Sequence, residues 1–259
     1  MSTFNFPLLL TTIVFLTGII WLLDILFFKK RRLKKNPSAN EPKLVEYSRS
    51  FFPILLLVLV IRSFIVQPYR VPTGSLEPTI LPGDLIAVNQ FAYGLKLPVL
   101  NKKIISIGEP KIGDIAVFRW PVNPSVDFIK RVVGVPGDHV IYKNKILYIN
   151  GKEATQKILG DAVDYEPSGN LNVQKIRENL NGVKHDILVN PYGGQLGDFD
   201  VVVPKGYYFM MGDNRDDSAD SRDWGFVPEK DLIGKGFIVW MSWDSEKHRI
   251  RWHRIGTVL

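Results

Sequence analysis

The chain of 259 residues contains no cysteine, which excludes a thiol nucleophile, a disulfide framework and a metal site built on thiolates. It has no internal repeat and no extended low-complexity tract. The four histidines, His139, His185, His248 and His253, are scattered, so a Ser-His-Asp triad would need long-range placement and stays open only as an alternative. These absences direct attention to other nucleophiles and bases.

Acidic residues cluster between positions 213 and 223, a pattern that could suggest calcium. An EF-hand loop starting at Asp213 would need glycine at its sixth position and glutamate at its twelfth, and these positions hold Ser218 and Trp224. We therefore interpret the cluster as a structural charge network with Arg215 and Arg222, and we predict neither a metal nor a cofactor.

Positive charge is concentrated in one short segment. Residues 29–50 hold eight lysines and arginines against two glutamates, which is +6 of the chain's net +7. The remainder is almost neutral, which argues against a nucleic-acid-binding surface. Because the basic segment lies between two apolar runs, a nucleic-acid-binding tail is a poor interpretation of it.

The two apolar runs predict membrane-spanning helices at about residues 6–28 and 51–67. The first is apolar except for threonines and Asp24, and at roughly 1.5 Å per residue it crosses a bilayer core of about 30 Å. The second is slightly short and contains Arg62, which can snorkel to the interface. A cleavable signal peptide would carry its positive charge before the apolar run, not after it. With residues 29–50 as a cytoplasmic loop, both ends of the chain are expected outside.

From Pro68 onward the pattern is of short strands, not helices, and it predicts an all-β domain. The expected strands are Asp84–Asn89, Asp114–Trp120, Asp127–Val135, His139–Lys143, Ile146–Ile149, Tyr207–Met211, Gly234–Trp243 and Ile250–Arg254. Asn150-Gly151 is a turn signal that predicts a hairpin after Ile146–Ile149.

Ser75 lies in the segment Val71–Thr79, where two prolines and a glycine forbid a regular helix and hold the backbone in a sharply turned path. Such a loop can present one hydroxyl. A serine after a glycine is an ordinary turn residue in most proteins, so the spacing alone does not identify a nucleophile.

Lys130 lies in a predicted strand whose alternation places it on one face with Phe128 and Val132. Burial among such apolar neighbours penalises the ammonium form and lowers the pKa of a lysine, and a neutral amine is a competent base. Ser-Lys is a known variant of the Ser-His-Asp arrangement. The alternative is a lysine that snorkels to solvent.

Four blocks of the chain resemble those of the bacterial type I signal peptidases, the membrane-bound leader peptidases, and they occur in the same order. Pro72–Ile80 resembles the nucleophile block Pro-Ser-Gly-Ser-Met-x-Pro-Thr-Leu. Gly113–Phe118 is similar to the strand block, and Asp127–Asp138 to the lysine block. Gly212–Arg222 is similar to Gly-Asp-Asn-Arg-Asp-Asn-Ser-x-Asp-Ser-Arg.

The resemblance implies a serine endopeptidase in which Ser75 is the nucleophile and Lys130 the general base. The hydroxyl of Thr73, which stands where many members have serine, would complete an oxyanion hole with the Ser75 N–H. Ser218 would hydrogen-bond and orient Lys130. Two further residues would brace that region: Asp220 and Arg222.

The family's specificity for small residues at the first and third positions before the cut implies shallow apolar pockets. The residues that match the lining positions are Val71, Pro72, Leu76, Phe128 and Ile129. Leu76 replaces methionine and conserves its volume. Asp217 replaces asparagine and Asp223 replaces a common tyrosine, which we interpret as surface variation.

The resemblance also implies a domain arrangement. Residues 1–67 would be the membrane anchor and residues 68–259 the catalytic domain, with a smaller inserted β subdomain at about residues 142–205. Ser75 follows the second span by about eight residues, which keeps it within about 30 Å of the bilayer at roughly 3.3–3.6 Å per residue.

The expected substrates are therefore secretory precursor proteins with signal peptides. The expected location is the bacterial cytoplasmic (inner) membrane, with several spans and the catalytic domain on the extracytoplasmic side in contact with the lipid bilayer. Two alternatives are a Ser-Lys protease that cuts itself or one dedicated partner, and a non-catalytic membrane-anchored β-domain.

Overall fold

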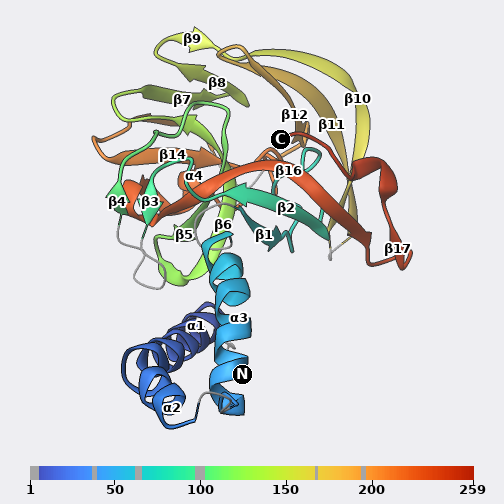
Figure 1. Ribbon diagram of the computed structural model, residues 1–259. Helices are drawn as coiled ribbons and strands as arrows, with labels where there is room; N and C mark the ends of the chain where they lie inside the picture. Colours follow the sequence, from blue (N-terminus) through green and yellow to red (C-terminus); the bar gives the residue numbers. More distant parts are fainter. Residues whose placement is uncertain (1–5, 37–39, 62–65, 97–102, 167–168, 194–196) are drawn as a thin grey trace. The chain divides into compact units, whose positions relative to one another are not determined.

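The computed structural model describes the chain except for residues 1–5, 37–39, 62–65, 97–102, 167–168 and 194–196. It divides into two compact units: Met1–Val66 with Lys96–Ile104, and Gln67–Leu95 with Ile105–Leu259. The first unit carries the long helices, and the second is built mainly of strands (Figure 1). The prediction of a mainly β chain is confirmed.

The first unit contains α1 (Phe6–Leu23), η1 (Asp24–Phe28), α2 (Lys29–Lys35) and α3 (Lys43–Val60). The Phe52 ring of α3 packs against α1, with its centroid 5.6 Å from that of the Trp21 ring. The same ring lies so close to Gly18 that a Cβ added there would be 2.6 Å from Phe52 Cε2. A glycine at this point lets the two helices approach closely.

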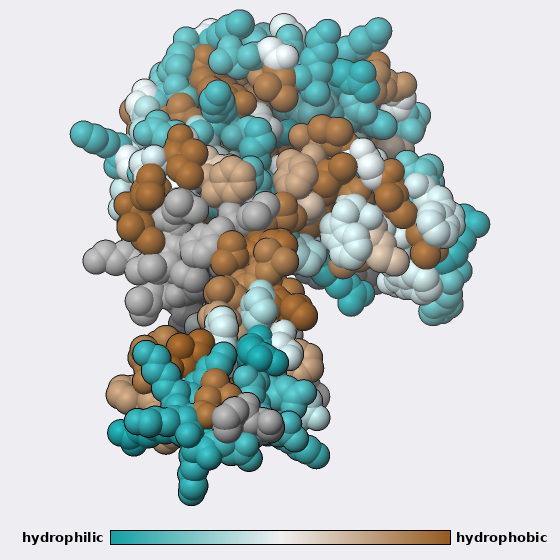
Figure 2. Space-filling model, viewed as in Figure 1, coloured by the Kyte–Doolittle hydropathy of each residue, from teal (hydrophilic) through white to brown (hydrophobic). Residues whose placement is uncertain are grey.

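Within the described residues, one helix is long and apolar enough to cross a membrane, Leu8–Lys35. The second predicted span is described only in part, because residues 62–65, which include Arg62, lie outside the described residues. Its described part up to Val60 belongs to α3, whose first half carries Lys43, Glu46 and Arg49. The predicted end of the span at residue 67 was wrong, because Val66 and Gln67 belong to a strand. Figure 2 shows apolar residues over the upper part of α3 and hydrophilic residues around α2.

The acidic residue inside the first apolar run is paired. Asp24 is 4% exposed, and Arg32 donates to both of its carboxylate oxygens, at 2.7 and 3.0 Å. An unpaired charge in an apolar helix is costly, and this ion pair offsets that cost with a residue two turns later.

The main sheet of the second unit has the strand order β1-β2-β16-β5-β6-β14-β15, with β17 paired to β16. Its strands are β1 (Val66–Arg70), β2 (Asp84–Asn89), β5 (Ile115–Trp120), β6 (Asn123–Gly134), β14 (Tyr207–Met211), β15 (Val227–Pro228), β16 (Leu232–Asp244) and β17 (Arg249–Ile250). The short elements of this unit are α4 (Ser221–Trp224), η3 (Glu229–Asp231) and η4 (Trp252–Arg254). The strands β3 (Leu95–Lys96) and β4 (Lys103–Ile105) pair with each other as a separate two-stranded sheet. From β2 to β15, and between β16 and β17, the paired strands of this sheet are antiparallel.

Two further sheets lie between β6 and β14 in the sequence. One has the order β13-β7-β8-β9, formed by β7 (His139–Lys143), β8 (Ile146–Ile149), β9 (Lys152–Glu153) and β13 (Phe199–Val202). The other has the order β10-β11-β12, formed by β10 (Thr155–Glu166), β11 (Gly169–Leu180) and β12 (Val183–Val189). We call these two sheets, with the turns that join their strands, the inserted sheets.

Most predicted strands of the second unit are present, and one was wrong. Residues 250–254 were expected to continue as a strand, but β17 ends at Ile250 and Trp252–Arg254 form a 3₁₀ turn. The turn predicted at Asn150-Gly151 joins β8 to β9, and both residues have positive φ, 52° and 77°, as a type I′ hairpin requires.

Candidate active site

Ser75 lies on a turn several of whose apolar residues are buried in the core of the β unit. Val71, Leu76 and Ile80 are 2% or less exposed and belong to one buried cluster. The Glu77 N–H donates to the Gly74 carbonyl at 2.8 Å, and the Ile80 N–H donates to the Leu76 carbonyl at 3.0 Å. These contacts fix the turn on both sides of Ser75. The Ser75 hydroxyl lies 3.5 Å from Thr73 Oγ1.

Lys130 lies in β6, between β5 and β14, and is 4% exposed. Its Nζ atom lies 5.8 Å from the centroid of the Phe128 ring, as the strand alternation predicted. Burial lowers the pKa of Lys130 to about 8, against the opposing influence of the Asp220 carboxylate. The amine can therefore lose its proton near neutral pH.

Gly212 connects the elements that carry Ser75 and Lys130. Strand β14 ends at Met211, which pairs with Arg131, so the next residue, Gly212, lies beside Lys130. A Cβ added to Gly212 would overlap both the Ser75 carbonyl oxygen and Ser218 Oγ. Ser75, Lys130 and Ser218 thus approach one glycine that leaves room for all three. Within the described residues, Ser75 Oγ and Lys130 Nζ are not joined by a hydrogen bond.

Asp220 and Arg222, the two residues expected to brace this region, form a buried ion pair. Arg222 donates to both carboxylate oxygens of Asp220, at 2.8 and 2.7 Å, and Asp220 accepts the Gly212 N–H at 2.9 Å. Burial would raise the pKa of Asp220, but Arg222, the Gly212 N–H and Lys130 together hold it below its usual range. Ser218 Oγ is buried and has no hydrogen-bond partner among the described residues.

A second buried ion pair, absent from the sequence-based prediction, lies next to Lys130. Arg131 Nε and Nη2 donate to the two carboxylate oxygens of Asp213, each at 2.7 Å. Thr79, from the turn that follows Ser75, donates to the same carboxylate at 2.5 Å. Arg131 and Asp213 are 82 residues apart, so no local pattern in the sequence indicates this ion pair. The one feature of the sequence that could have indicated it is the position of Arg131 beside Lys130.

A family model and two known proteins match most of this chain. The family model "Signal peptidase, peptidase S26" matches residues 44–243. The chain is 44% identical to signal peptidase I of Pseudomonas fluorescens, over 98% of this chain and 99% of that one. It is also 44% identical to signal peptidase I of Pseudomonas aeruginosa, over 95% of each chain.

The chain belongs to the signal peptidase I family. The resemblance found in the sequence is thereby confirmed, and the protein is a signal peptidase. A solved structure of a signal peptidase I from Enterococcus faecalis V583 is 31% identical, covers 50% of this chain and 98% of its own, and has a TM-score of 0.34.

The residues expected to form this signal peptidase's substrate pockets are not all brought together. Val71, Leu76 and Ile129 belong to one apolar cluster, in which Leu76 is fully buried. Pro72 is exposed. Phe128 packs in a different cluster and stacks on Trp120, with ring centroids 5.1 Å apart.

Among the described residues, no histidine of this signal peptidase forms a hydrogen bond with Ser75. His139 pairs with Asp200 on the surface, at 2.5 Å. His185 is buried on β12, with Nε2 3.4 Å from Glu178 and 3.7 Å from Asp213. Within the described residues no group of histidine and acidic side chains has the arrangement of a metal site.

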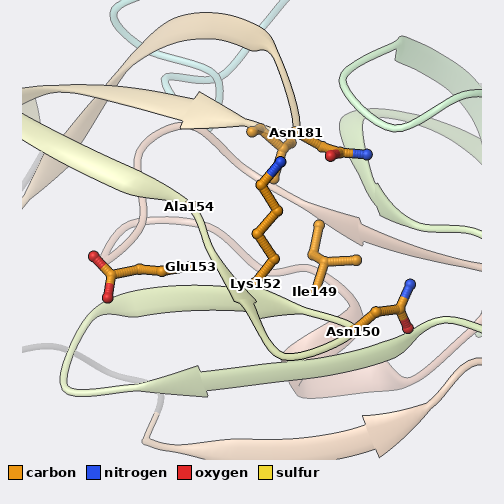
Figure 3. Close-up of a pocket in the computed structure, with 7 residues that line it drawn as sticks. Ile149, Asn150, Lys152, Glu153, Ala154 and Asn181 are labelled. Carbon is orange, nitrogen blue, oxygen red and sulfur yellow. The ribbon is translucent and has the colours of Figure 1, made fainter.

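A pocket of about 230 Å³ lies in the inserted sheets. Its lining residues come from the β8–β9 hairpin, the residue that follows β9, and the end of β11 with its turn: Ile149, Asn150, Lys152, Glu153, Ala154, Leu180 and Asn181. Figure 3 labels all of them except Leu180. None of the residues predicted for the catalytic site lines it.

Proposed function

We propose that this signal peptidase cleaves its substrates by acyl-enzyme chemistry, with Ser75 as nucleophile and Lys130 as general base. The observation that carries the proposal is the buried position of Lys130 across Gly212 from the Ser75 turn, with its pKa lowered to about 8. A serine hydroxyl becomes nucleophilic only when a neighbouring base accepts its proton, and a neutral lysine can do so.

In the first step, Lys130 Nζ takes the Ser75 Oγ proton while Oγ bonds to the scissile carbonyl carbon. The resulting oxyanion would be stabilised by the Ser75 N–H and the Thr73 hydroxyl, which lies 3.5 Å from Ser75 Oγ. When the peptide bond breaks, the new amino terminus takes the proton from Lys130 and an ester to Ser75 remains.

In the second step, Lys130 takes a proton from water, and the hydroxide oxygen bonds to the ester carbon. Collapse of this intermediate breaks the bond to Ser75 Oγ, which regains a proton from Lys130. The cleaved leader leaves as a carboxylic acid, which then loses its proton to water. The Ser218 hydroxyl, which has no hydrogen-bond partner among the described residues, would orient Lys130 in this proposal, and Asp220 with Arg222 would hold the segment that carries Ser218. Val71, Pro72, Leu76, Phe128 and Ile129 remain the proposed substrate-binding residues.

We further propose that the substrates are secretory precursors presented at the bacterial inner membrane. The family implies substrates that bear signal peptides, and the apolar helix Leu8–Lys35 fits a membrane anchor. The apolar run that begins at residue 51 would form a second span. The basic residues 29–50 favour a cytoplasmic loop between the spans, which would leave the β unit on the extracytoplasmic side.

The test uses detergent-solubilised wild-type enzyme, Ser75→Ala and Lys130→Ala with a precursor that carries an Ala-x-Ala leader. Release of the mature product is followed by mass. We expect cleavage at that junction by the wild type alone. A wild-type rate in Lys130→Ala would eliminate the proposed base and return attention to the histidines.

A further inference from the structure

The segment Asp213–Asp216 links the two elements of the proposed catalytic pair. Its Asn214 N–H donates to the Ser75 carbonyl at 3.2 Å, which ties the segment to the nucleophile turn. The Asp213 carboxylate holds Arg131, the residue after Lys130 in β6. A displacement of this segment would therefore change the position of Ser75 relative to Lys130.

All four residues of this segment are held by the inserted sheets. The backbone of Leu188 in β12 accepts the Arg215 N–H and donates to the Asp213 carbonyl, both at 2.9 Å. The side chain of Asn214 donates to Asp164 of β10 at 2.7 Å. These contacts join residues up to 50 positions apart in the sequence.

Asp216 also accepts the Asn190 N–H at 2.6 Å, and two ion pairs add to these contacts. Arg215 forms a two-pronged pair with Glu178 of β11, and both side chains are 1% exposed or less. Burial alone would raise the pKa of Glu178, but Arg215 and His185 outweigh it and hold the pKa at about 2, so the carboxylate stays ionised. Lys145, at the β7–β8 turn, donates to both oxygens of Asp216, at 2.8 and 2.9 Å.

We propose that the inserted sheets position the catalytic pair: they hold Asp213–Asp216 in place, and this segment fixes the Ser75 turn and the Lys130 strand relative to each other. Asp164, Glu178 and Lys145 are then positioning residues that act at a distance. The inference rests on the Ser75–Lys130 mechanism proposed above. It assigns a role in catalysis to a part of the chain that supplies no reacting atom.

Asp164 offers a sharp test because one change removes its contact and another keeps it. It is 3% exposed, and Asp164→Ala leaves Asn214 without this acceptor, whereas Asp164→Asn retains a carbonyl oxygen. Asp161→Ala, an exposed aspartate three residues earlier in the same strand, is the matched control. All variants are made in the full chain.

We expect kcat of Asp164→Ala to fall roughly ten- to a hundred-fold with KM little changed, since small misplacements of reacting groups have costs of this size. Asp164→Asn should recover most of the loss, and Asp161→Ala should match the wild type. A residue that only supports folding would lower the unfolding temperature and leave kcat unchanged below it. Wild-type kcat in folded Asp164→Ala would overturn the inference.

Lys145 provides an independent second test if Asp164→Ala does not fold. Its side chain is 31% exposed, so Lys145→Met should be tolerated better, and Lys145→Arg can keep the charge on Asp216. We expect kcat to fall in Lys145→Met and to be retained in Lys145→Arg and in the exposed neighbour variant Lys143→Met. Wild-type kcat in Lys145→Met would equally overturn the inference.

Ser75→Ala is measured in the same assay to separate the two proposals. Activity that persists in Ser75→Ala eliminates the proposed mechanism, whatever the positioning variants do. Loss of activity in Ser75→Ala together with wild-type kcat in the Asp164 and Lys145 variants eliminates only the positioning role of the inserted sheets.

Discussion

At the residue scale, the chemistry of Lys130 depends on its burial in β6. Loss of water lowers its pKa to about 8, and Arg222 acts in the same direction, while Asp220, Asp217 and Asp213 act against both. The amine is thus neutral over a useful pH range although several carboxylates lie near it. Two of these carboxylates are paired with arginines: Asp220 with Arg222, and Asp213 with Arg131.

The pH dependence of cleavage should follow the titration of Lys130, whose pKa is about 8. A base acts in its unprotonated form, so kcat/KM should rise with pH through a midpoint near about 8 and level off above it. The measurement is kcat/KM for a leader-bearing substrate across the pH range in which the wild type stays folded. A midpoint near about 10.5, the value of an ordinary lysine, would contradict burial of the base.

Asp217, which we interpreted from the sequence as surface variation, is half-buried, and its charge raises the pKa of Lys130, so it offers a finer test. Asp217→Asn removes that charge and should move the midpoint of the kcat/KM profile to lower pH. Asp223→Asn, on the exposed side of α4, should leave the profile unchanged. An identical midpoint in wild type and Asp217→Asn would show that Asp217 does not influence the base.

Thr73 tests the oxyanion hole in the same way. Thr73→Val keeps the shape of the side chain but removes the hydroxyl that lies 3.5 Å from Ser75 Oγ. We expect kcat to fall by roughly 10²–10³-fold with KM little changed, since the hydroxyl would act mainly in the transition state. Thr73→Ser should retain activity. Equal kcat in Thr73→Val and the wild type would exclude this hydroxyl from catalysis.

At the element scale, the sheet depends on one glycine where β14 leaves β6. Gly212→Ala would place a methyl group against the Ser75 carbonyl oxygen and 2.5 Å from Ser218 Cβ, and neither atom can withdraw without moving its backbone. We expect activity to be lost and the free energy of unfolding to fall by roughly 1–3 kcal/mol. Gly197→Ala, where no atom lies within 4 Å, is the control. Activity assays and urea unfolding of both variants decide the outcome.

Local sequence pattern predicted the elements whose residues alternate clearly. The strands β2, β7, β8 and β14 begin and end where the pattern placed them. The long hairpin of β10 and β11 was not predicted, because its strands contain glycine, aspartate and asparagine and are held by pairing with each other. The strand expected at residues 250–254 was wrong, although its apolar and basic residues suit a strand. The strand pairing with β16 ends at Ile250, and the chain then forms a 3₁₀ turn.

The candidate site likewise contains residues that a local sequence pattern can indicate and residues that it cannot. Ser75, Thr73 and Lys130 could be chosen from short motifs whose neighbours in sequence set their conformation. The contacts with the inserted sheets could not: Glu178 lies 37 residues from Arg215, Lys145 lies 71 from Asp216, and Asp164 lies 50 from Asn214. Only the packing of the inserted sheets brings these partners together, so no local pattern indicates them.

At the scale of the whole molecule, the β unit should lose stability in acid. The pKa values of Asp213 and Asp220 are held below the usual range, and that of Glu178 is about 2, because buried arginines outweigh the cost of burial. Groups with a depressed folded-state pKa stabilise the fold above their unfolded-state pKa of about 4, and this stability is lost as pH falls through the folded value.

We therefore expect the free energy of unfolding to decrease from about pH 4.5 toward about pH 2, with Glu178 alone contributing on the order of 3 kcal/mol. Urea unfolding at a series of pH values measures this. Glu178→Gln should be less stable at neutral pH and should show a shallower acid dependence. A stability that does not change over this range would contradict the ionised state of the buried network.

The membrane anchor is the other feature that belongs to the whole molecule. The helix Leu8–Lys35 exposes large apolar side chains, among them Phe15, Leu16 and Leu22, each more than half exposed. Such a surface is stable only against lipid or another apolar partner. The full chain expressed in bacteria should therefore sediment with membranes and resist extraction by alkaline carbonate, whereas a fragment of residues 67–259 should be extracted. Release of the full chain by carbonate would show that the helix lies on the membrane and does not cross it.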